Sequence, residues 1–126
     1  MLKSALFLAA LLVPFATVAG PCSFIFEVNG MKETYPPECI ESISYLDSDE
    51  VGSENLNFSL SNECGKELNK TTKQNIGKKL SIYYKGNLLS SANIASVLRN
   101  NFRFSSKEMP RIVLMQLLYD YGVKHN

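Results

Sequence analysis

Short segments of alternating apolar and polar residues, each bounded by a turn sequence, run through this chain and restrict it to antiparallel strand pairs. Residues 23–28 alternate in this way and are followed by Asn29-Gly30. Residues 31–35 come next and are expected to return as the antiparallel partner strand. Asn-Gly is a preferred pair for a two-residue hairpin turn, and alternation places every second side chain on one face of a sheet. We therefore expect a hairpin here, and a second one around Gly86-Asn87.

The rest of the chain predicts further strands and two longer helices. Residues 40–46 and 56–60 also alternate, and the polar residues 47–55 form the loop between them. Two helices are expected, one beginning at Ser61 or Asn62 and one capped by Ser105 or Ser106. The last helix carries a wide apolar surface that we expect to lie against a sheet: Ile112, Val113, Leu114, Met115, Leu117, Leu118 and Tyr119. These elements predict an α+β fold, a mainly antiparallel sheet with two or three helices packed on one face.

The first nineteen residues have the pattern of a secretory signal peptide. Lys3 precedes an apolar run over residues 5–13, and Thr17 and Ala19 are the small residues that precede a cleavage site. We expect cleavage after Ala19, because the apolar run is short for an uncleaved anchor. Residues 20–126 are then a single domain, periplasmic or secreted, with no stable membrane span after removal of the leader.

Charge is divided unevenly along the chain. Residues 20–63 contain nine acidic residues and one basic residue, whereas residues 64–126 contain eleven basic and three acidic residues. Such a division either creates two oppositely charged faces or, as we favour, disappears when interleaved strands bring the halves together. The basic half has no nucleic-acid motif, and we expect no nucleic-acid partner.

Three cysteines in an oxidising compartment predict one disulfide and one further thiol. All three pairings of Cys22, Cys39 and Cys64 are possible. The first hairpin places Cys22 opposite Pro37, two residues from Cys39, so we expect the Cys22–Cys39 pair. Cys64 would then be the remaining thiol.

No group of residues predicts catalysis, a cofactor or a metal. His125 is the single histidine and lies next to the end of the chain. The dense carboxylate group over residues 47–54 partly imitates a calcium loop, yet Val51 and the missing terminal glutamate break the pattern. We therefore expect a solvated acidic loop and a protein that is not an enzyme.

Several short motifs occur in a fixed order in the second half of the chain. They are Phe58 and Leu60 at the end of a strand, a helix to Thr72, Asn75-Ile76-Gly77-Lys78, Lys85-Gly86-Asn87, Ala92-Asn93-Ile94, Asn101-Phe102-Arg103-Phe104 and a leucine-rich last helix. This order resembles the head of the first periplasmic domain of SecD, a Sec-translocon accessory protein, most closely over residues 56–122. Two positions depart from the family: Lys85 stands where an acidic residue is usual, and Asn93 where proline is frequent. The transmembrane helices of SecD have no counterpart here, so the resemblance does not imply proton-driven translocation.

The resemblance implies a non-enzymatic module that binds protein, for example exported or unfolded polypeptides or a translocon component. Contact would be made through an exposed sheet edge or the turn around Lys85. An alternative is an immunity or inhibitor protein, whose acidic loop would enter the cationic cleft of a toxin or hydrolase acting in the envelope. The candidate contact residues are Asp47, Asp49, Glu50, Glu54, Tyr84, Lys85 and Asn87.

Overall fold

The computed structural model describes residues 22–46 and 54–122. Within these residues lie seven strands, one 3₁₀ turn and two α-helices. In chain order they are β1 (Phe24–Val28), β2 (Met31–Tyr35), η1 (Pro37–Cys39), β3 (Ile40–Leu46), β4 (Asn55–Leu60), α2 (Asn62–Lys73), β5 (Lys79–Tyr84), β6 (Asn87–Asn93), β7 (Asn101–Ser105) and α3 (Arg111–Tyr121). The α+β class with antiparallel strands is confirmed.

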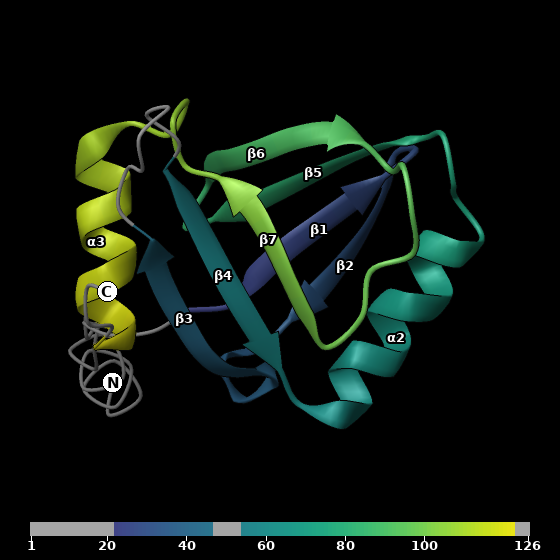
Figure 1. The fold of residues 1–126 in the computed structure, drawn as a ribbon, viewed down its shortest axis with the longest axis horizontal. Coiled ribbons are helices and arrows are strands. Elements are labelled where there is room, and N and C mark those ends of the chain that lie inside the picture. Colours follow the sequence, from purple (N-terminus) through teal and green to yellow (C-terminus); the bar gives the residue numbers. More distant parts are fainter. Residues whose placement is uncertain (1–21, 47–53, 123–126) are drawn as a thin grey trace, which may run out of the picture.

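The strands form two sheets rather than one. The first has the order β2-β1-β5-β6 and the second has the order β3-β4-β7. Pro36 and Pro37 separate the sheets along the chain, because proline cannot continue a hydrogen-bonded ladder and η1 begins there. The two helices lie at opposite ends of the molecule (Figure 1), with α3 beside β3 and α2 at the far end.

Aromatic rings from both sheets make the centre of the core. Phe24 and Phe26 of β1 meet Phe58 of β4 and Phe102 of β7. The ring centroids lie 5.2 Å apart for Phe24–Phe58 and 6.1 Å apart for Phe26–Phe102, both edge to face. Such pairs add to the free energy gained by burying apolar area. The two sheets are therefore joined through their facing aromatic side chains.

Both predicted hairpins are present. Val28 pairs with Met31 around Asn29-Gly30, where both turn residues have positive φ. The second turn is Lys85-Gly86, one residue earlier than expected, because Tyr84 pairs with Asn87. Lys85 has a φ of 51°, which is uncommon for a residue that is not glycine.

The start of α2 is as predicted from the sequence, whereas the start of α3 is not. Ser61 caps α2, and its hydroxyl accepts a hydrogen bond from the Cys64 backbone N–H at 3.3 Å. The expected cap of α3 at Ser105 or Ser106 is wrong: Pro110 is the N-cap, and a turn closed by the Met109 N–H to Ser106 carbonyl bond precedes it. Neither helix in the described part is long and apolar enough to cross a bilayer.

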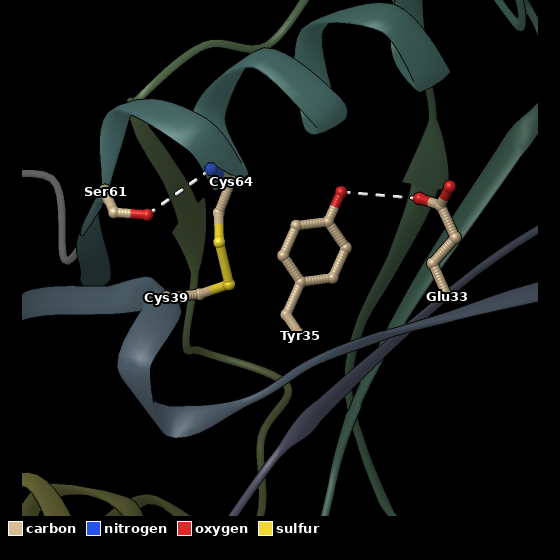
Figure 2. Close-up of a disulfide and its surroundings, with 5 residues drawn as sticks. All are labelled: Glu33, Tyr35, Cys39, Ser61 and Cys64. Atoms are coloured by element: carbon tan, nitrogen blue, oxygen red, sulfur yellow. Dashed lines mark hydrogen bonds between the residues drawn. A yellow bond between two sulfur atoms is a disulfide. The ribbon is translucent and has the colours of Figure 1, made fainter.

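The disulfide joins Cys39 to Cys64, not Cys22 to Cys39 as expected. The hairpin register itself is as predicted, with Phe24 opposite Tyr35. The two prolines after Tyr35 then turn the chain away from β1, so Cys39 reaches the start of α2, where the Ser61 N–H donates to the Cys39 carbonyl at 2.9 Å. Figure 2 shows the bridge between η1 and the first turn of α2.

Candidate functional site

One side of α3 exposes large apolar side chains. Ile112, Met115 and Tyr119 are 78%, 56% and 81% exposed. Their spacing of three and four residues places them on one helix face. The opposite side buries Val113, Leu114, Leu117 and Leu118 in the core. The expectation that the whole apolar surface packs against a sheet is therefore wrong for these three residues, because α3 lies at one end of the molecule and buries only one face.

The β5–β6 turn is fastened to α3 through a buried carboxylate. Asp120 is 8% exposed, and its Oδ2 accepts a hydrogen bond from the Tyr84 hydroxyl at 2.7 Å. The Lys85 ammonium lies 2.7 Å from the same oxygen, and the Gln116 amide donates to Oδ1 at 2.8 Å. Three donors thus share one carboxylate, and two of them tie the turn to the helix.

These contacts set the charge states of Asp120 and Lys85. Burial alone would raise the pKa of Asp120, but the hydrogen bonds from Lys85, Tyr84 and Gln116 outweigh it and hold the pKa below its usual value. The hydrogen bond to Asp120 raises the pKa of Lys85. Burial, followed by the hydrogen bond to Asp120, raises the pKa of Tyr84. At neutral pH the pair is therefore ionised, and its two charges offset each other.

A shallow pocket of about 300 Å³ lies between the turn and α3. Its lining comprises Tyr84, Lys85, Asn87, Ile112, Val113 and Gln116. Ile112 belongs both to this pocket and to the exposed face, so the two are continuous. We call them together the α3 face, defined by Lys85, Asn87, Ile112, Met115 and Tyr119. An apolar surface with amide groups at its side is suited to contact with a protein.

The residues expected to contact a partner fall into two groups. Tyr84, Lys85 and Asn87 come together at the pocket, with the Tyr84 ring buried and the other two residues exposed. Asp47, Asp49 and Glu50 lie outside the described residues. Glu54 is described, and its carboxylate accepts a hydrogen bond from the Tyr45 hydroxyl at 3.0 Å and lies 3.9 Å from the Arg111 guanidinium.

The exposed residues of α3 are the part of this site that sequence patterns missed. Residues 112–119 are apolar on almost all sides of the helix. Such a pattern indicates that more than one face of the helix needs a neighbour, but it does not say which face the core covers. Among the described residues, no group of three or more histidine, cysteine or carboxylate side chains is arranged to hold a metal ion.

A family model and a solved structure both resemble this chain. The family model of the SecDF P1 head subdomain matches residues 39–111. A solved structure, described as "Structure and function of a membrane component SecDF that enhances protein export", superposes with a TM-score of 0.55 at 14% sequence identity, covering 83% of this chain and 70% of that one. At this identity the superposition shows a shared fold. No curated protein matches the chain.

Proposed function

Because the chain belongs to the family of SecDF P1 head subdomains, we propose that it is a protein-export module that binds polypeptides and carries out no bond chemistry. The observation that carries the proposal is the exposed apolar side of α3, where Ile112, Met115 and Tyr119 lie together. Burial of such side chains against a partner contributes about 25 cal/mol for each Å² of apolar area removed from water. An unfolded polypeptide, which exposes apolar side chains, is a suitable partner.

The compartment follows from the same proposal. A signal peptide over residues 1–19 would deliver a single domain, residues 20–126, to the periplasm or the exterior. There the chain would meet polypeptides emerging in an unfolded state. The Cys39–Cys64 disulfide supports this location, since disulfides persist in oxidising compartments.

The inhibitor alternative has no support in the described residues. It depended on the acidic loop, of which only Glu54 is described, and the Glu54 carboxylate is engaged by Tyr45 and Arg111.

The proposal predicts that crosslinking to unfolded polypeptide depends on the α3 face. We expect the Ile112→Ser/Tyr119→Ser variant to lose most of its crosslinking, at least fivefold, to an unfolded exported protein, because both side chains are solvent-exposed and contribute apolar area to a partner. A photoreactive group at position 115 would report the contact, with the folded form of the same substrate as the comparison.

The matched control is Ile76→Ser/Leu88→Ser, which removes two exposed apolar side chains that belong neither to the α3 face nor to β2. Thermal unfolding of each variant checks that the fold is retained. If folded and unfolded substrates label equally, or if both double variants lose labelling to the same extent, the proposal is wrong.

A further inference from the structure

A groove of about 430 Å³ lies between β2 and the first half of α2, remote from the α3 face. β2 contributes Glu33, Thr34 and Tyr35, followed by Pro36. The disulfide and two glutamates of α2 complete the lining: Cys39, Cys64, Glu63 and Glu67. Figure 2 shows the Tyr35 ring between the disulfide and the Glu33 carboxylate, beneath α2. The floor of the groove is therefore an aromatic ring and a disulfide, and its rim is acidic.

The groove opens along an edge of a sheet. Among residues 22–46 and 54–122, β2 is the outermost strand of its sheet and pairs with β1 alone. In a two-residue hairpin the residues that flank the turn, here Val28 and Met31, exchange backbone hydrogen bonds, and bonded pairs then alternate along the ladder. Thr34 lies opposite Ile25 of β1, and by this alternation the two residues exchange no backbone hydrogen bonds. Its N–H and C=O consequently point away from the sheet at the groove, where an added strand would bind.

The carboxylates at the groove are not paired with basic side chains in the part of the chain that the structure describes. Glu33 accepts hydrogen bonds from the Thr71 hydroxyl at 3.0 and 3.1 Å and from the Tyr35 hydroxyl at 3.3 Å, and both donors are neutral. Within residues 22–46 and 54–122, no lysine or arginine forms an ion pair with Glu33, Glu63 or Glu67. The lining contains no basic residue. Charge complementarity therefore favours a cationic occupant over an acidic one.

From these observations we propose that the groove binds an extended basic segment of a polypeptide as an additional strand on β2. Backbone bonds to Thr34 would fix the strand, and alternate lysine or arginine side chains would face Glu63 and Glu67. This inference rests on the proposed function, and it adds the chemical class of the segment that is bound. It also predicts that the interaction weakens as salt screens the carboxylates.

The test measures binding of a fluorescent seven-residue peptide of alternating lysine and valine to the full chain by anisotropy. We expect Glu63→Gln/Glu67→Gln to weaken binding at least fivefold, because both side chains are exposed and their charge faces the groove. The matched control is Glu41→Gln/Glu108→Gln, which removes the same charge from exposed positions outside the groove and should leave binding unchanged.

Backbone contact is tested separately, on the peptide and on the protein. A peptide with methylated backbone nitrogens should bind at least fivefold more weakly, and so should the native peptide to Thr34→Pro, which removes an outward N–H without breaking a bond to β1. Absence of lysine–valine binding, equal binding of a glutamate–valine peptide, or unchanged binding by the Glu63 and Glu67 variant overturns the groove proposal. Crosslinking through the α3 face is independent of these results, so the two proposals fail separately.

Discussion

Reduction of the Cys39–Cys64 disulfide should lower the free energy of unfolding by about 3.5 kcal/mol. The two cysteines are 25 residues apart, and the chain-entropy model assigns a loop of this length about that contribution. The effect is large because a domain of this size is stabilised by only about 5–15 kcal/mol in total. Urea unfolding with and without a reductant measures the difference directly.

Cysteine variants identify the bond that is responsible. Cys39→Ala/Cys64→Ala should unfold at the same lowered urea concentration whether or not reductant is present. Cys22→Ser keeps the bridge and should change the free energy of unfolding by less than about 1 kcal/mol. A loss for Cys22→Ser as large as that for the Cys39 and Cys64 variant would instead indicate the Cys22–Cys39 pairing.

Local sequence patterns predicted the elements better than their assembly. Asn29-Gly30 fixed the first hairpin because both residues tolerate positive φ, and Ser61 fixed the start of α2 through its hydroxyl. The division into two sheets was not predicted, since alternation says which face of a strand is buried but not which strand lies beside it. The predicted Cys22–Cys39 pairing was wrong because Pro36 and Pro37 redirect the chain after a correctly predicted hairpin. Local patterns do not show where the chain goes after such a turn.

Of the candidate site, sequence patterns predicted only the residues at the β5–β6 turn. The turn around Lys85 is visible in the sequence, and the structure places it against α3. The exposure of Ile112, Met115 and Tyr119 could not be read from hydrophobicity, because which side of an almost wholly apolar helix is covered depends on the tertiary arrangement. Asp120, the residue that joins turn and helix, gave no local signal, since its partners Tyr84 and Lys85 are 36 and 35 residues away in the chain.

Asp120→Ala is the second substitution with a large expected effect, a loss of about 2–3 kcal/mol in the free energy of unfolding at neutral pH. The change leaves the buried Tyr84 hydroxyl and the Lys85 ammonium without their common acceptor. Because the Lys85 side chain is 27% exposed, water replaces part of its ion pair, and the loss is smaller than for a fully buried pair. Lys85 also adopts positive φ, which becomes harder to maintain once its side chain is released.

The dependence on pH distinguishes this ion pair from simple packing. The native structure lowers the pKa of Asp120 below the value of about 3.9 expected for an unfolded chain, so the folded state binds fewer protons there. The stabilisation by Asp120 is therefore fully present well above pH 4 and is lost as the pH falls through the lowered native pKa. The difference in unfolding free energy between the native chain and Asp120→Ala should shrink between pH 7 and pH 3, whereas the exposed control Glu108→Gln should show little difference at either pH. A difference that stays constant over this range would show that Asp120 stabilises the α3 face by packing and not by its charge.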